Sequence, residues 1–334
     1  MKIKTLIVNA VAMIVLAASP LVAEEPTVET VVDGLYNPCA VAIQPKTGIV
    51  FVSDSGAGRV IRVVDGKAQD VIVGFAKDVY GKGPKFDIGP LGLVFLNKNT
   101  LVVGGGDHID GEELLRVFSV PAPGAPAIKA SDATDSYNMP AIGDIKGEGN
   151  FYGLARKGRA IYITCNGDDT KGWIAKATIK KGKVTSFERF LPTKENTEVD
   201  APIAAVISPK GDLVIGQGGE VTVPEDSLLT FYNMEGEMLL NLETGLYDIT
   251  GLAYSTDGKK LFATDFAWMK TSEGGLFQLI STDDKQTIEA KKLVSLDKPT
   301  ALAVQGDTIY ITVFGTPAEG SDVRSGKLVK VTVK

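Results

Sequence analysis

The stretch ITGLAYS (249–255), TDGKK (256–260), LFATD (261–265) and GGLFQLI (274–280) decides the fold. It contains three short apolar runs, with Asp257 and Gly258 in the turn between the first two. Runs of this length, rich in branched and aromatic residues and bounded by Gly and Asp, indicate the strands of a meander rather than helices. A Gly in such a turn adopts a positive φ without strain.

The same unit occurs six times along the chain. Its first copy reads PCAVAIQ (38–44), PKTG (45–48), IVFVSD (49–54) and RVIRVV (59–64). A small residue stands near the start of each first strand, about every 50 positions: Ala40, Gly92, Gly153, Ala204, Gly251 and Ala301. A repeat of this length built only of short strands is typical of β-propeller blades, whose inner strands converge on one axis.

We therefore predict an all-β fold, a six-bladed β-propeller with four-stranded blades. Outer strands are expected at DVIVGF (70–75), FERFLP (187–192), MLLNLE (238–243) and KKLVSL (291–296). The last unit ends without an outer strand, whereas TVETVV (27–32) has no blade of its own. We expect residues 27–32 to pair beside residues 327–331 and to close the ring, which leaves no exposed edge between the first and last blades.

The first 23 residues resemble a secretion signal. Lys2 and Lys4 precede an apolar stretch over residues 6–18, and Ala23 supplies a small residue at the cleavage position. The stretch is short for a membrane span. We expect cleavage after Ala23, a periplasmic or secreted protein, and a single propeller domain over residues 24–334.

The net charge argues against two classes of partner. It is −6 for the whole chain, and it becomes −8 without Lys2 and Lys4. An acidic chain without a basic run disfavours nucleic acid and anionic membranes. We expect a monomer that binds a small molecule, a carbohydrate or a protein and does not insert into a membrane.

The two cysteines, Cys39 and Cys165, fall in blades one and three of the predicted ring. A disulfide requires Cα atoms within roughly 7 Å. We therefore expect two free and mostly buried thiols.

In a four-stranded blade, the loops before first strands and the loops after second strands share one face. This face collects the candidate ligand-binding residues Asn37, Asp54, Asp107, His108, Asn166, Asp168, Asp248 and Trp268. Oxygen-rich clusters suit a hard cation, so one divalent cation, Ca²⁺ first, is the expected cofactor, with Asp265 and Asp54 as candidate ligands. Each has a structural alternative, because an Asp after a strand commonly forms a turn and Trp268 can simply cover a loop.

Several chemistries are excluded. A single histidine, His108, rules out His-rich zinc or copper sites. No G-x-S-x-G elbow accompanies it to build a Ser–His–Asp site, and no C-x-x-C-H motif could attach a haem.

Two segments resemble known repeats. LYNPCAVAIQPKTGIVFVSDSGAGRVIRV (35–63) is similar to an NHL-type propeller repeat, with Pro38 before the first strand and Asp54 ending the second. ITGLAYSTDGKKLFATDF (249–266) resembles a repeat of the gluconolactonase-like (senescence marker protein) family. That resemblance implies an axial divalent metal held by a Glu, by Asn residues and by an Asp ending a second strand, to which Asp265 corresponds. Thr250 stands where the family has an Asn, and residues 37–39 where it has the Glu.

These observations favour an exported binding or scaffold protein whose central cup holds a carbohydrate, a small metabolite or a peptide. The alternative is a metal-dependent lactonase or esterase-like hydrolase of the gluconolactonase type. In it, the metal would polarise the carbonyl group and a carboxylate such as Asp248 or Asp107 would act as the base. A third hypothesis is an oxidoreductase subunit with a bound quinone, but the chain lacks the repeated Trp motifs expected of that class.

Overall fold

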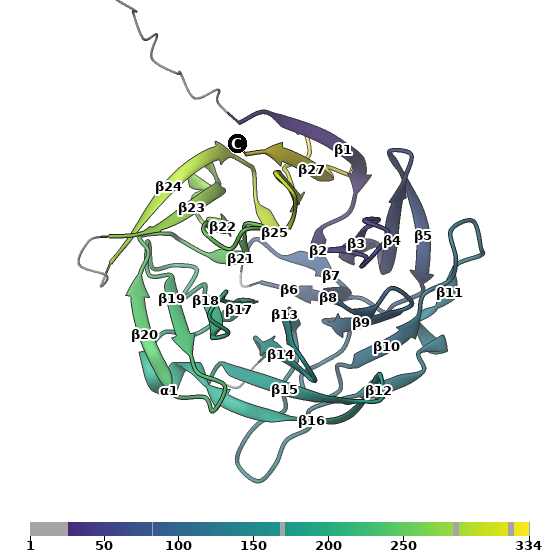
Figure 1. The fold of residues 1–334 in the computed structure, drawn as a ribbon, viewed down its shortest axis with the longest axis horizontal. Helices are drawn as coiled ribbons and strands as arrows, with labels where there is room; N and C mark the ends of the chain where they lie inside the picture. Colours follow the sequence, from purple (N-terminus) through teal and green to yellow (C-terminus); the bar gives the residue numbers. More distant parts are fainter. Residues whose placement is uncertain (1–25, 82, 168–170, 283–286, 320–323, 334) are drawn as a thin grey trace, which may run out of the picture.

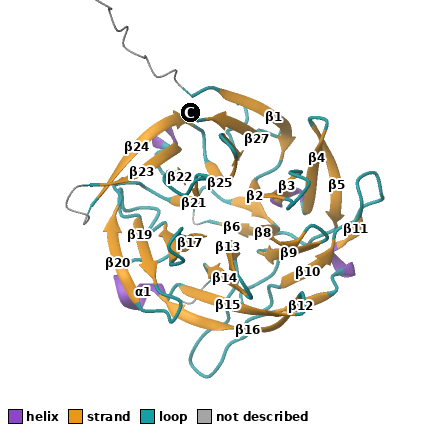
Figure 2. Ribbon diagram, in the orientation of Figure 1, coloured by secondary structure: helices purple, strands orange, loops and turns teal. Residues whose placement is uncertain are grey.

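The computed structural model describes residues 26–81, 83–167, 171–282, 287–319 and 324–333. In these residues six blades of four antiparallel strands surround one axis (Figure 1, Figure 2). The predicted signal segment and Asp168 lie outside the described residues. Within the described ranges, no helix has both the length and the apolar character needed to cross a membrane.

The strands of each blade follow one another from the axis outward. Blade one contains β2 (Pro38–Ile43), β3 (Val50–Asp54), β4 (Arg59–Val64) and β5 (Lys67–Val73), and β11 (Ile128–Lys129) joins its outer edge. Blade two contains β8 (Pro90–Asn97), β9 (Thr100–Gly105), β10 (Leu115–Ser119) and β12 (Asp135–Tyr137). Blade three contains β13 (Phe151–Lys157), β14 (Ala160–Cys165), β15 (Trp173–Lys180) and β16 (Lys183–Pro192), which the short helix α1 (Thr193–Thr197) follows.

Blade four contains β17 (Pro202–Ile207), β18 (Leu213–Gln217), β19 (Leu228–Tyr232) and β20 (Met238–Glu243). Blade five contains β21 (Ile249–Tyr254), β22 (Leu261–Asp265), β23 (Gly275–Ser281) and β24 (Ile288–Ser295). Blade six contains β25 (Pro299–Gln305), β26 (Thr308–Val313) and β27 (Gly326–Thr332), and its outer strand is β1 (Val28–Leu35). The hairpin of β6 (Asp78–Tyr80) and β7 (Phe86–Ile88) belongs to no blade.

The predicted ring closure is confirmed. β1 pairs antiparallel with β27, from Val28 opposite Val331 to Leu35 opposite Gly326. The buried side chains of Val32 and Leu35 pack in one apolar cluster with residues of blades six and one. The N-terminal strand therefore both covers the outer edge of blade six and joins the two ends of the chain.

Small residues at the start of the inner strands allow the blades to approach each other. A Cβ atom on Gly92 would lie 2.3 Å from the backbone oxygen of Tyr152 in blade three. One on Gly153 would lie 2.5 Å from the backbone oxygen of Ile203 in blade four. Both distances are shorter than real Cβ contacts, so the predicted role of these residues in close packing around the axis is confirmed.

Hydroxyl side chains link neighbouring blades at the same level. The inner strand of blade one is bulged after Pro38, and the freed backbone N–H of Ala40 donates to Ser53 Oγ at 2.8 Å. Ser53 Oγ in turn donates to the backbone oxygen of Leu91 in blade two at 2.7 Å. Thr164, in the second strand of blade three, makes the equivalent bond to Ile203 at 2.8 Å. Thr250 and Thr300, in inner strands, bond to Pro299 and Pro38 of the next blade at 2.9 and 2.6 Å. These bonds fix the spacing of the inner strands around the axis.

Candidate functional site

The hairpin β6–β7, residues 78–88, covers the axis on the face where inner strands begin and second strands end (Figure 1). We call it the cap hairpin. Blade one holds one side of it, because the Tyr36 hydroxyl donates to Asp87 Oδ2 at 2.9 Å. Asn37 Nδ2 donates to the backbone oxygen of Asp87 at 3.0 Å. The predicted binding residue Asn37 therefore positions the cap hairpin.

Blades three and five hold the other side of the cap hairpin. Trp268 Nε1 donates to the backbone oxygen of Gly83 at 3.2 Å, and Asn166 Nδ2 donates to the Tyr80 hydroxyl at 2.7 Å. Gly81 has a φ of +111°, and a Cβ atom there would lie 2.7 Å from the Trp268 ring. Both the backbone conformation and the closeness of the ring thus require Gly at this position.

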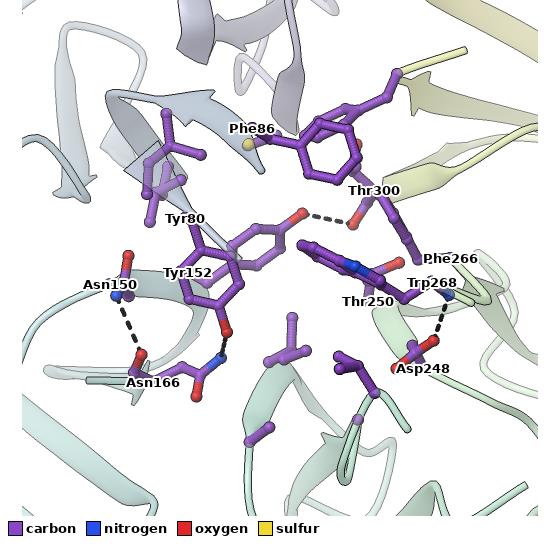
Figure 3. A pocket seen from close by; sticks show the side chains of 18 of the residues that line it. Tyr80, Phe86, Asn150, Tyr152, Asn166, Asp248, Thr250, Phe266, Trp268 and Thr300 are labelled. Carbon is purple, nitrogen blue, oxygen red and sulfur yellow. Dashed lines mark hydrogen bonds between the residues drawn. The ribbon is translucent and has the colours of Figure 1, made fainter. Parts of the chain in front are cut away.

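A cavity of ≈ 100 Å³ lies on the axis between the cap hairpin and the first residues of the inner strands (Figure 3). We call it the axial pocket. Six aromatic side chains line it: Tyr80, Phe86, Tyr152, Phe266, Trp268 and Phe314. The centroid of the Phe86 ring lies 5.1 Å from that of Trp268 and 5.3 Å from that of Phe314, both with edge-to-face geometry. These contacts fix the rings and give the pocket a rigid, mainly apolar wall.

Tyr152 crosses the axis at the base of this pocket. Its hydroxyl, from blade three, donates to the backbone oxygen of Thr300 in blade six at 3.0 Å (Figure 3). Burial raises the pKa of Tyr152 far above its ordinary value. The hydroxyl is therefore neutral and serves as a hydrogen-bonding strut between opposite blades.

Asp248 is the one carboxylate among the residues that line the axial pocket. Its side chain accepts the backbone N–H of Trp268 at 2.5 Å through Oδ2, and the residue is only 6% exposed. Burial raises the pKa of Asp248 to about 7, and the nearby charges of Asp265 and Asp226 add to the shift. Within the part of the chain that the structure describes, no Lys or Arg side chain pairs with Asp248.

A larger cleft of ≈ 690 Å³ lies beside the cap hairpin, and Tyr80, Asn166 and Trp268 line it as well as the axial pocket. We call it the outer cleft. Four acidic residues line it, together with the basic residues His108 and Lys194: Asp78, Asp110, Asp200 and Glu220. Lys194 Nζ pairs with Asp200 Oδ2 at 3.0 Å. The outer cleft is therefore polar and acidic where the axial pocket is apolar.

Of the two predicted residues Asp107 and His108, Asp107 is buried in the interior and His108 lines the outer cleft. Asp107 is 3% exposed, and Arg116 contacts both its oxygens, at 3.0 Å from Oδ1 and 2.9 Å from Oδ2. His108 Nδ1 lies 3.2 Å from Asp107 Oδ1, and its ring lines the outer cleft. Asp107 therefore positions Arg116 and His108, and only His108 is placed to meet a ligand.

Asp54 and Asp265, the predicted metal ligands, are buried at the ends of second strands and do not line the axial pocket. Asp54 accepts the backbone N–H of Tyr36 at 2.6 Å and Arg59 Nε at 2.7 Å. Asp265 accepts three backbone N–H groups, from Tyr247, Asp248 and Ala267, at 3.0, 2.8 and 3.1 Å. In the structure both carboxylates tie the loop before an inner strand to the loop after a second strand.

A hard cation would find a different set of oxygen atoms in the axial pocket. Asp248, Asn150 and Asn166 line it with one carboxylate and two amide side chains, which are ligand types that Ca²⁺ accepts, but Asp248 lies across the pocket from the two amides (Figure 3). In the described ranges, no three His, Cys, Asp or Glu side chains converge in a way that could hold a metal ion. One Ca²⁺ thus stays a prediction, with Asp248 better placed in the pocket than Asp265.

The structure brings three predicted residues, Asn166, Asp248 and Trp268, together around the axial pocket. The prediction missed Tyr80 and Phe86, because the segment DVYGKGPKFDI (78–88) falls outside the repeat. Its Gly-Lys-Gly-Pro centre between two apolar flanks is a hairpin signal that could have identified it. Cys39 also lines the pocket, and both Cys39 and Cys165 are free and buried.

Comparisons with known proteins place the fold. A gluconolactonase from Xanthomonas campestris superposes with a TM-score of 0.57 at 13% identity, over 93% of this chain and 90% of that chain. A glucose dehydrogenase superposes with a TM-score of 0.58 at 15% identity, over 92% of this chain and 100% of that chain. Virginiamycin B lyase from Staphylococcus aureus superposes with a TM-score of 0.51 at 14% identity, over 93% of this chain and 100% of that chain. No protein-family profile and no curated protein matches the sequence.

At these identities the superpositions show the fold alone. The expected resemblance to gluconolactonase-like six-bladed propellers is confirmed at that level.

Proposed function

We propose that this chain is an exported small-molecule-binding protein whose ligand enters the axial pocket. The observation that carries the proposal is the pocket itself, an apolar cavity closed by aromatic rings that contains a single carboxylate, Asp248. Ligand sites in proteins are typically concave and apolar with a few well-placed polar groups, which fits this arrangement. The adjoining outer cleft offers room for a polar remainder of the ligand.

The volumes restrict what can bind. A cavity of ≈ 100 Å³ accepts a group no larger than a small ring, since a cavity of about 150 Å³ is known to hold benzene. The rest of the ligand would lie in the outer cleft, whose lining is polar. We infer a metabolite with a compact, mainly apolar head and a polar body, rather than a long apolar chain.

Tryptophan fluorescence tests the proposal. The chain has two tryptophans, and only Trp268 lines the axial pocket, whereas Trp173 is in β15 of blade three. Titration with a panel of small ring compounds and sugars should quench or shift the emission of wild type and of Trp173→Phe. Trp268→Phe should lose most of this signal. Quenching that persists unchanged in Trp268→Phe would place the ligand elsewhere and contradict the proposal.

A second candidate is a metal-dependent hydrolase of lactones, which the presence of one carboxylate, Asp248, on the wall of the axial pocket favours. A divalent cation bound there would supply polarisation of a carbonyl group and an activated water molecule. Asp248 would hold it, while the aromatic wall would orient the lactone ring. Proton release from glucono-δ-lactone with Ca²⁺, lost in Asp248→Asn, would favour the hydrolase over a binding protein.

A further inference from the structure

We infer that the ligand of the axial pocket is an organic cation, an amine or quaternary ammonium compound whose charged head lies between the aromatic wall and Asp248. This inference rests on the proposed binding function and adds the chemical class of the ligand. Three features of the described residues support it: the aromatic rings that line the pocket, the buried Asp248 carboxylate without a cationic partner, and the negative charge of the outer cleft.

The lining of the axial pocket is the first feature. The ring of Trp268 contacts those of Tyr80 and Phe86 edge to face, with centroids 5.9 Å apart for Tyr80 and 5.1 Å apart for Phe86. Phe266 and Phe314 extend the same wall. Aromatic rings gathered around a small cavity attract an organic cation through their electron-rich faces, and most strongly when the cation is desolvated.

Asp248 is the second feature. It is 6% exposed and accepts a hydrogen bond from the Trp268 backbone N–H through Oδ2, and no Lys or Arg side chain of the described ranges forms an ion pair with it. By contrast, Asp54 and Asp107 each have an Arg partner, and Asp265 accepts three backbone N–H groups. A buried carboxylate without a cation is costly, so a cationic ligand would compensate a charge that the protein leaves uncompensated.

The outer cleft is the third feature. Four carboxylate residues line this cleft, whereas Lys194 and His108 are its basic residues. Lys194 forms an ion pair with Asp200. Because the cleft and the axial pocket share Tyr80, Asn166 and Trp268, this acidic surface adjoins the pocket. An acidic approach raises the local concentration of cations and repels anions such as sugar acids.

The size of the pocket also fits. A trimethylammonium head is comparable in size to a small ring, so a cavity of ≈ 100 Å³ has room for such a group. Several other polar side chains of the wall, Asn166, Tyr152, Thr250 and Thr300, donate their hydrogen bonds to protein partners. They are therefore less available to the buried hydroxyl groups of a neutral sugar.

A matched pair of probes tests the inference. Choline and its neutral carbon isostere 3,3-dimethylbutan-1-ol have the same shape and differ in charge. We expect calorimetric titration at about pH 8.5, where Asp248 is ionised, to show choline binding at least about tenfold more tightly than the isostere. Asp248→Asn should abolish this preference, since Asn keeps an oxygen for the Trp268 N–H but carries no charge. Asp257→Asn, which removes an exposed charge in the β21–β22 turn, should bind as wild type does.

The outcomes separate this inference from the proposed function. Equal affinity for the two probes, lost in Trp268→Ala, would overturn the organic cation and keep the binding site. Preference for choline that survives in Asp248→Asn would overturn the role of Asp248. Displacement of choline by micromolar Ca²⁺ would show that the pocket holds a metal and would overturn the inference. If neither probe binds but the small ring compounds still change the tryptophan emission, the organic cation is overturned and the binding site is kept.

Discussion

Glu113 offers a sharp test of how the interior is charged. It follows β9 in the loop before β10, is 1% exposed, and accepts the backbone N–H of Asn150 through Oε2. Burial raises the pKa of Glu113 from 4.5 to about 9, and the negative charges of Asp110, Asp107 and Asp78 add to the shift. The folded protein therefore keeps this carboxyl protonated at neutral pH.

The sign of the pH effect follows from this shift. Because the pKa is higher in the folded state, the contribution of Glu113 to stability is complete below about pH 4.5 and declines as the pH rises towards about 9. Between about pH 4.5 and pH 7 the loss is on the order of 3 kcal/mol, from about 1.4 kcal/mol for each pH unit. Glu113→Gln retains an oxygen for the Asn150 N–H and has no proton to lose.

We therefore expect Glu113→Gln to gain about 3 kcal/mol of unfolding free energy relative to wild type between about pH 4.5 and pH 7. Urea unfolding followed by tryptophan fluorescence at several pH values measures this difference. Glu112→Gln is the matched control, because Glu112 is exposed and its substitution should show almost no such trend. A difference that stays constant or falls with rising pH would show that Glu113 is ionised in the fold and would refute the reasoning.

Three further predictions concern the ring and its buried groups. Deleting residues 24–33 should expose the edge of β27 and give an aggregated product by light scattering; a monodisperse, stable product would argue against closure by β1. Cys39 and Cys165 should react slowly with iodoacetamide in the native protein and completely in denaturant, as mass spectrometry of unreduced protein shows; thiols that stay unmodified in denaturant would indicate a disulfide. Asp265→Ala should lower the unfolding free energy by about 3 kcal/mol, because three backbone N–H groups lose their acceptor; a variant with normal stability in urea but no ligand binding would instead make Asp265 a functional residue.

The ring could be predicted from sequence because its determinants repeat. The inner strand of each blade packs closely against the next blade near the axis, so Gly92 and Gly153 occupy equivalent positions. The repeat of small residues is therefore visible in the sequence alone. Closure by β1 followed from a simple imbalance, an extra strand at one end and a missing strand at the other. The bonds from Ser53 and Thr300 to the next blade were not predicted, since a hydroxyl in a strand has no fixed partner until the neighbouring blade is in place.

The candidate site could be predicted only in part because the cap hairpin interrupts the repeat once. Carboxylates at strand ends were expected to converge on the axis, but the direction of a side chain depends on which backbone N–H groups are within reach. Asp265 accepts the N–H group of Ala267 in its own turn and two from the loop before β21, whereas Asp248, one residue before β21, lines the axial pocket. The sequence names both residues and cannot distinguish these two environments.

The cap hairpin also changes what the predicted residues do. In a symmetric ring, Asn37, Asn166 and Trp268 would line an open cup of acidic loops. With the hairpin in place, all three donate hydrogen bonds to it, and Tyr80 and Phe86 carry aromatic rings onto the axis. One inserted segment thus converts a polar cup into an apolar pocket with a single carboxylate beside an acidic cleft. The chemistry of the site is therefore set jointly by the loops of the blades, which supply Asp248 and Trp268, and by residues 78–88, which the repeat does not contain.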